Sequence, residues 1–175
     1  GAIPLANRAI HDPAQEHGVQ MGSTAVALVI RGDEFAVLWA GDSRAYLFRQ
    51  GELILLTRDH TQVQEMVDRG LLSEEEAADH PMKHVLSRAV GVEETLEIDA
   101  IRDQLQSRDL FILCSDGLYG MVDEARIAAI LQDHGPVASE ALIAESLERG
   151  ATDNVTVTVI GVSEPTLLAL NGGLT

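Results

Sequence analysis

The sequence predicts an α+β fold in which an antiparallel sheet is covered by helices. Segments with strand character and tight turns fill residues 23–56, whereas helical patterns fill residues 62–90 and 123–150. Strands and helices are therefore segregated along the chain rather than strictly alternating, which favours α+β over α/β. A length of 175 residues, with 46% hydrophobic residues, suffices for one domain with a sizeable core.

The first half of the chain contains two hairpin signals. Gly32-Asp33 and Gln50-Gly51 are turn sequences, and each lies between two apolar segments. The four segments are residues 23–31, 34–40, 44–49 and 52–56. Four strands joined in this way predict an antiparallel meander.

The remaining elements follow from periodicity and caps. Ser73 and Glu76 form a capping box, Asp123 is a good N-cap, and Pro136 opens a helix that Gly150 closes. Residues 1–20 are expected to hold the tail end of a helix and a polar loop. Further helical patterns are expected over 63–70, 73–80, 84–90, 123–134 and 136–150, and strands over 96–101, 110–114 and 155–159.

Composition excludes several classes of partner. Twelve Lys and Arg against 28 Asp and Glu give a net charge of −16, which disfavours nucleic acid and anionic membranes and suits either cation binding or simple solubility. The longest aliphatic run, Ala25–Ile30, is too short to span a bilayer, and no signal-peptide pattern opens the chain. The lone Cys114 cannot form an internal disulfide and fits, weakly, a reducing cytosol.

Three acids occupy the same context. Asp42 and Asp116 each come just after an apolar strand, and Asp153 precedes one, with glycine or small residues beside all three. If these carboxylates converge at one rim of the sheets, they need a cation, and without a Cys/His cluster it must be a hard one such as Mg²⁺, Mn²⁺ or Ca²⁺. Each Asp alone is equally explained as a turn cap, and periodicity does not decide between the two interpretations.

Other residues that could belong to a functional site have simpler structural explanations. Pro81 lies between His80 and His84, so a helical metal pair is not expected and both are taken as surface residues. Asp59 and His60 are adjacent on an extended segment, where side chains point apart. Cys114 ends a buried strand and is expected to be inert.

Six motifs occur in the order found in one family. They are MGSTAVALVI, AGDSRAYLFRQGEL, LTRDHT, HVLSRAVG, CSDGLYGMV and GATDNVTVTVI. In this order they resemble the metal-dependent serine/threonine phosphatases of type 2C, bacterial type. The resemblance covers residues 1–162, includes a flap at about residues 62–90, and leaves 163–175 as a tail.

The resemblance implies a four-layer α-β-β-α sandwich and hydrolysis of phosphoserine and phosphothreonine in proteins. It implies two Mn²⁺ or Mg²⁺ ions and a third, weaker one. Asp116 and Asp153 are implied ligands of one metal, and Asp42, together with Asp116, of the third. The implied partners are phosphorylated proteins and a serine/threonine kinase whose action the phosphatase opposes in the cytoplasm.

Two departures from the family pattern set further expectations. In the family, an Arg that grips the phosphate, an Asp that bridges the metals and a His that is a candidate proton donor all lie upstream of the motifs matched here. No catalytic residue is therefore identified in this sequence. The N-terminal strands are expected to be missing, and residues 1–175 alone are expected to be inactive. Gly120 stands where many members have an acid serving the third metal. A non-catalytic phosphatase-like binding module is the alternative function, and a calcium-binding module is disfavoured because no D-x-D-x-D-G loop is present.

Overall fold

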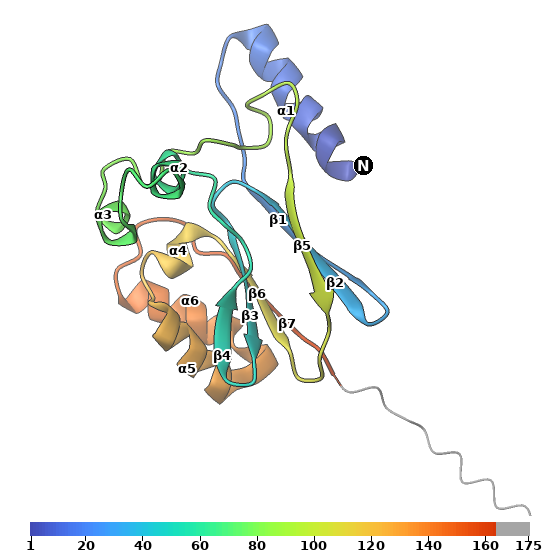
Figure 1. The fold of residues 1–175 in the computed structure, drawn as a ribbon, viewed down its shortest axis with the longest axis vertical. Coiled ribbons are helices and arrows are strands. Elements are labelled where there is room, and N and C mark those ends of the chain that lie inside the picture. The colour runs from blue at the N-terminus through green and yellow to red at the C-terminus, as the bar shows by residue number, and fades with distance from the viewer. Residues whose placement is uncertain (164–175) are drawn as a thin grey trace, which may run out of the picture.

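The computed structural model describes residues 1–163, which form two antiparallel sheets and several helices (Figure 1). The predicted tail, residues 163–175, lies almost wholly outside the described residues. The strands are β1 (Ala25–Arg31), β2 (Glu34–Ala40), β3 (Arg44–Arg49), β4 (Glu52–Leu55), β5 (Asp99–Gln104), β6 (Leu110–Cys114) and β7 (Val157–Gly161). The helices are α1 (Ala2–His17), α2 (Gln62–Asp68), α3 (Glu74–Ala78), α4 (Asp116–Tyr119), α5 (Glu124–His134), the 3₁₀ turn η1 (Gly135–Val137) and α6 (Ser139–Glu148).

The two sheets pack face to face. One has the strand order β1-β2-β5 and the other β4-β3-β6-β7. Alternate residues of β2, namely Phe35, Val37 and Trp39, meet Leu47 and Phe111 of the second sheet in one buried cluster. This cluster is the interior of the sandwich, as the period of two in strands requires.

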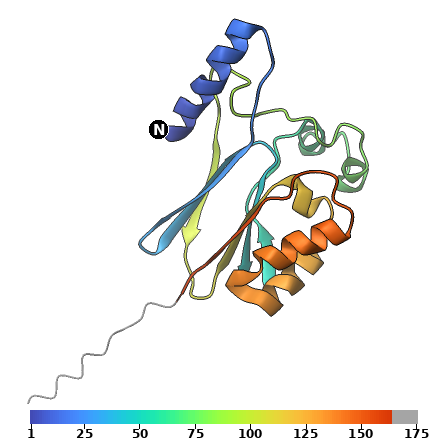
Figure 2. The same ribbon diagram turned by 180° about the vertical axis from the view of Figure 1, so that it is seen from behind.

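Helices α5 and α6 cover the other face of the four-stranded sheet, opposite the three-stranded one (Figures 1 and 2). Ile127, Ile130 and Leu131 of α5 are buried against Tyr46 and Ile112 of that sheet. Asp123 caps α5 as predicted, accepting a hydrogen bond from the Arg126 N–H at 2.8 Å. The α+β class, with paired antiparallel sheets flanked by helices, is thus confirmed.

Helix α1 lies beyond the end of the three-stranded sheet (Figure 1). The buried Asn7 side chain fastens it there, because Nδ2 donates to the carbonyls of Glu93 and Glu94 and Oδ1 accepts from the Gly91 N–H at 2.6 Å. No helix among residues 1–163 has both the length and the apolar character needed to cross a membrane.

The predicted four-stranded meander is wrong. The two hairpins form, but β2 pairs with β5 whereas β3 pairs with β6, so the hairpins belong to different sheets. The chain changes sheet at Gly41, whose φ of +107° lies in the left-handed region that few other residues adopt. Hairpin signals are local, and the sequence carried no comparable signal for which sheet each hairpin joins.

Three other expectations need adjustment. Residues 84–90 form turns and isolated bridges, Thr61 with Leu86 and Ser23 with Val90, and not a helical turn. The strand expected over 96–101 is Asp99–Gln104, and the one expected from 155 begins at Val157. In each case pairing with a distant strand decides the bounds, and periodicity alone does not report it.

Candidate metal centre at the strand ends

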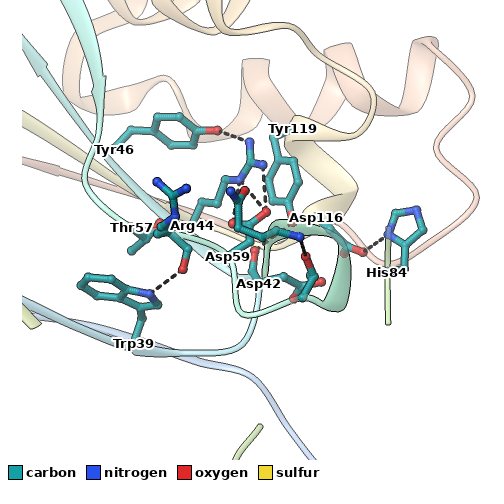
Figure 3. A network of polar contacts seen from close by, with 12 residues as sticks. Trp39, Asp42, Arg44, Tyr46, Thr57, Asp59, His84, Asp116 and Tyr119 are labelled. Atoms are coloured by element: carbon teal, nitrogen blue, oxygen red, sulfur yellow. Dashed lines mark hydrogen bonds and ion pairs between the residues drawn. The ribbon is translucent and has the colours of Figure 1, made fainter. Parts of the chain in front are cut away.

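Strand pairing explains why Asp42 and Asp116 come together. Arg44, the first residue of β3, is the register partner of Cys114, the last residue of β6. Asp42 lies two residues before Arg44, and Asp116 lies two residues after Cys114. Both carboxylates therefore lie at the same rim of the four-stranded sheet, as Figure 3 shows. The sequence predicted this convergence without being able to establish it.

The electrostatics of Asp42 reflect that proximity. Burial raises the pKa of the Asp42 carboxyl above its ordinary value, and the negative charges of Asp116 and then Asp59 raise it further. Two neighbouring carboxylates destabilise each other's ionised form unless a cation compensates. This rim is therefore a place where a bound cation would be favoured.

Asp116 opens the short helix α4, which the sequence analysis missed. His84 of the flap lies beside it, with Nδ1 3.7 Å from the Asp116 Oδ2. The His84 side chain is 62% exposed, so it is a surface residue as expected, but one at the edge of this site. His80 uses its Nδ1 to accept a hydrogen bond from the Met82 N–H.

Asp153 lies on the loop packed against Asp116. The Ser115 hydroxyl donates to the Asn154 carbonyl at 3.2 Å, and a Cβ on Gly117 would come within 2.5 Å of that same oxygen. The Asp153 side chain itself is turned toward its own loop, where Oδ1 accepts from the Asn154 N–H at 2.7 Å. The loops that carry Asp116 and Asp153 are therefore adjacent.

The donor set partly fits the implied divalent cation. Asp42 and Asp116 supply carboxylate oxygens, the ligand type that Mg²⁺ and Mn²⁺ prefer. Among residues 1–163, however, no three His, Cys, Asp or Glu side chains lie close enough together to hold a metal ion. The described residues thus offer an incomplete coordination shell.

A half-buried polar network supports this rim. The Arg44 guanidinium is paired with Asp59 through Nε at 3.0 Å and Nη2 at 2.9 Å, and it lies 3.7 Å from the centroid of the Tyr119 ring (Figure 3). The Tyr119 hydroxyl donates to the Asp42 carbonyl at 2.8 Å. Burial has the largest single effect on the pKa of Arg44 and lowers it, but the hydrogen bonds that Arg44 donates to Asp59, together with the charge of Asp59 and the neighbouring Tyr46, raise the pKa overall, so the guanidinium stays charged.

Sequence reasoning missed this network because its members come from three separate segments. The motifs RAYLFR, LTRDHT and CSDGLYG contain Arg44, Asp59 and Tyr119, but nothing local indicates that they meet. The expectation that Asp59 and His60 point apart is correct, because Asp59 binds Arg44 and His60 binds Gly41 and Asp99.

A pocket of about 370 Å³ opens beside the rim. It is lined by Arg44 and Tyr119 of the sheet rim and by flap residues that include Gln64, Glu74 and His84. The lining brings together cationic, acidic and amide side chains. The pocket reaches toward Asp116 through His84, which lines it and whose Nδ1 lies 3.7 Å from the Asp116 Oδ2.

Comparison with known proteins agrees with this picture. The family model described as protein phosphatase 2C matches residues 5–66. The chain is 37% identical over 142 residues to the serine/threonine phosphatase stp of Listeria innocua, covering 80% of this chain and 56% of the relative.

Solved structures are similar as well. The serine/threonine phosphatase of S. agalactiae superimposes with a TM-score of 0.85 at 37% identity, over 93% of this chain and 68% of that one. The catalytic domain of the phosphatase PstP, solved in complex with two manganese ions, gives a TM-score of 0.78 at 33% identity, over 90% of this chain and 67% of that one.

The chain belongs to the protein phosphatase 2C family, as the six motifs suggested. It spans 56% of the length of the Listeria protein.

Proposed function

We propose that the protein is a metal-dependent serine/threonine phosphatase that hydrolyses phosphoserine and phosphothreonine in other proteins. The observation that carries this proposal is the convergence of Asp42 and Asp116 at one rim of the sandwich, with the pKa of Asp42 raised by burial and by Asp116. Membership of the protein phosphatase 2C family supports it.

The cofactor we propose is Mn²⁺ or Mg²⁺, two ions with a weaker third. A relative solved with two manganese ions supports the choice of metal. Asp116 and Asp153 would hold one ion, and Asp42 with Asp116 the third. Bound divalent ions supply a water of lowered pKa and neutralise phosphoryl charge. Tyr119, against whose ring Arg44 lies, holds the Asp42 turn through the Asp42 carbonyl.

The substrate-contacting part of the protein is proposed to be the flap, residues 62–90. Gln64, Glu74 and His84 of the flap line the pocket beside Asp116, which supports this assignment. A phosphorylated side chain directed at Asp116 would place its flanking residues against these groups. Loops and short helices on a rigid sheet are well suited to substrate selection.

In the cell we propose a cytoplasmic signalling role, opposing a serine/threonine kinase. The bacterial phosphatases similar to this chain support it. The phosphatase unit is proposed to extend over residues 1–162.

The test compares Asp116→Asn with Asp133→Asn in purified protein that also carries the upstream motifs of the family. Asp116→Asn removes a charge that holds the cation but keeps the shape, so turnover of a phosphothreonine peptide in Mn²⁺ is expected to fall by orders of magnitude with the melting temperature little changed. Asp133 is exposed on α5, far along the chain from the rim, and its variant should retain wild-type turnover. Equal activity in both variants would refute the proposal.

A further inference from the structure

His60 is buried beside the turn that carries Asp42, and it binds that turn twice. Its backbone N–H donates to the Gly41 carbonyl at 3.0 Å, and its ring Nδ1 accepts from the Gly41 N–H at 3.2 Å. His60 is 7% exposed. One residue therefore satisfies both backbone groups of Gly41, immediately before Asp42.

The tautomer of His60 follows from these contacts. The Gly41 N–H can only donate, so Nδ1 must be unprotonated and the ring proton must lie on Nε2. Nε2 lies 3.2 Å from Asp99 Oδ2, to which it donates. Asp99 thus fixes the tautomer that Gly41 needs, in the way that a carboxylate orients a histidine elsewhere.

Asp99 is held in turn by the flap. The Nη1 of Arg88, near the end of the flap, donates to Asp99 Oδ1 at 2.8 Å. Arg88 Nη1 also lies 3.4 Å from His60 Nε2, but with the proton on Nε2 this longer approach joins two donors and is not a hydrogen bond. The Ser87 N–H donates to the His60 carbonyl at 2.9 Å, which adds a backbone link between flap and turn.

The surroundings keep the His60 ring in this orientation. The Trp39 indole stacks on it, with ring centroids 6.2 Å apart and planes 24° apart. The Trp39 Nε1–H is itself anchored on the Arg58 carbonyl at 2.8 Å. On the other side of the turn, the hydroxyls of Thr24 and Ser43 lie 2.8 Å apart.

We propose that Arg88, Asp99 and His60 form a positioning relay that connects the end of the flap to the Gly41–Asp42 turn and sets the affinity of the Asp42 carboxylate for its divalent cation. None of the three residues touches the Asp42 carboxylate, so the relay acts through the backbone of Gly41. The inference rests on the proposed function for the identity of the cation. Displacement of Arg88 when the flap moves would then weaken cation binding at Asp42.

The experiment measures two quantities that need no turnover, the exchange rate of the Gly41 amide by NMR and Mn²⁺ binding by calorimetry, in the full-length protein. His60→Leu removes the acceptor for the Gly41 N–H and is expected to speed exchange at Gly41 and weaken the Asp42-dependent Mn²⁺ site, each by about tenfold. His60→Asn offers a carbonyl oxygen near the position of Nδ1 and should restore much of the protection. Arg88→Gln should weaken Mn²⁺ binding with a smaller effect on exchange.

The matched control is His134→Asn, at the exposed C-terminal end of α5, which should change neither quantity. If His60→Leu does not fold, Arg88→Gln and Asp99→Asn still test the relay, because the side chains of Arg88 and Asp99 are partly exposed. Unchanged Gly41 exchange and Mn²⁺ affinity in the folded variants would overturn the relay. A wild-type protein that binds Mn²⁺ with these dependences but hydrolyses no phosphopeptide would refute the proposed function and leave the relay standing.

Discussion

At the scale of single residues, Gly41 determines the path of the chain into the site. Its φ is +107°, and an added Cβ would lie 2.5 Å from the Thr24 Cγ2 and 2.7 Å from the Thr24 Cβ. Gly51, in the β3–β4 turn, also has positive φ at +87°, but nothing lies within 4 Å of its missing Cβ. Comparing substitutions at Gly41 and Gly51 therefore separates the energetic cost of a positive φ, which both positions share, from the cost of steric crowding, which only Gly41 has.

We expect Gly41→Ala to destabilise the protein by about 2 kcal/mol more than Gly51→Ala, because only Gly41 adds a clash to the backbone strain. Urea unfolding of both variants gives the comparison. Equal losses would mean that Thr24 moves aside and that the turn is less tightly packed than described.

His60 makes stability depend on pH. Burial lowers its pKa below the ordinary value of 6.5, against the opposing effect of Asp99. Below about pH 6.5 the unfolded chain therefore binds more protons at His60 than the folded chain does. The contribution of neutral His60 to the free energy of unfolding is complete above about pH 6.5 and is lost as the pH falls toward the pKa of His60 in the folded protein.

The pH dependence of the free energy of unfolding between pH 7.5 and 5 is accordingly expected to be steeper in the wild type than in His60→Asn, which cannot titrate there. Unfolding in urea at several pH values measures both slopes. Parallel curves would show that the decline comes from other groups.

At the scale of elements, Asp109 ties the β5–β6 connection to the end of β3. Its carboxylate is 1% exposed and accepts from Arg49 Nε at 2.8 Å, Arg49 Nη2 at 2.7 Å and the Gln106 N–H at 2.8 Å. Asp103 also approaches Arg49, at 3.7 Å, but is 59% exposed. One pair is enclosed by the protein and the other is solvated.

Asp109→Ala should lower the free energy of unfolding by about 3 kcal/mol, because it leaves a half-enclosed guanidinium and a backbone N–H without their acceptor. Asp103→Ala should cost less than about 1 kcal/mol. Denaturant titration of the two variants checks the difference, and a small loss for Asp109→Ala would show that water replaces the carboxylate readily.

The elements also show what the sequence could and could not predict. The bounds of β2 and β6 and the caps Ser73 and Asp123 were predictable, because alternation and capping are local. The assignment of the hairpins to two sheets was not, since it depends on which distant strand pairs with β2 and β3.

The candidate site was also only partly predictable from the sequence. Asp42, Asp116 and Asp153 stood out as acids at strand ends, and the family motifs added their roles as metal ligands. The Arg44–Asp59 pair and the contacts of His60 were not foreseen, because each joins segments that only the tertiary fold brings together. Family motifs predict which residues matter, and the fold determines how those residues are held.

At the scale of the whole molecule, the incomplete coordination shell leads to a prediction about residues 1–175 by themselves. No three potential ligands converge among the described residues. We expect this chain alone to hydrolyse a phosphothreonine peptide at no appreciable rate, even in millimolar Mn²⁺, because the two-ion mechanism needs shared anionic ligands that hold the ions together.

A version that also carries the upstream motifs of the family, with the bridging Asp, should show manganese-dependent activity in the same assay. Calorimetry with Mn²⁺ on both versions separates weak metal binding from a chemical defect. Robust turnover by residues 1–175 would reveal a substitute ligand set.

The pairing of β3 with β6 also bears on how quickly the protein reaches its native state. The hairpins β1–β2 and β3–β4 join neighbouring segments and can form within about 1–10 μs. The contact between Arg44 and Cys114 closes a loop that contains the flap and all of β5. The conformational entropy of this loop must be lost before the packing of the two strands can compensate for the loss. Folding should therefore be limited by the long-range pairings of β3 with β6 and of β2 with β5 and take milliseconds to seconds, while the hairpins form and dissolve many times before the strands of each sheet meet.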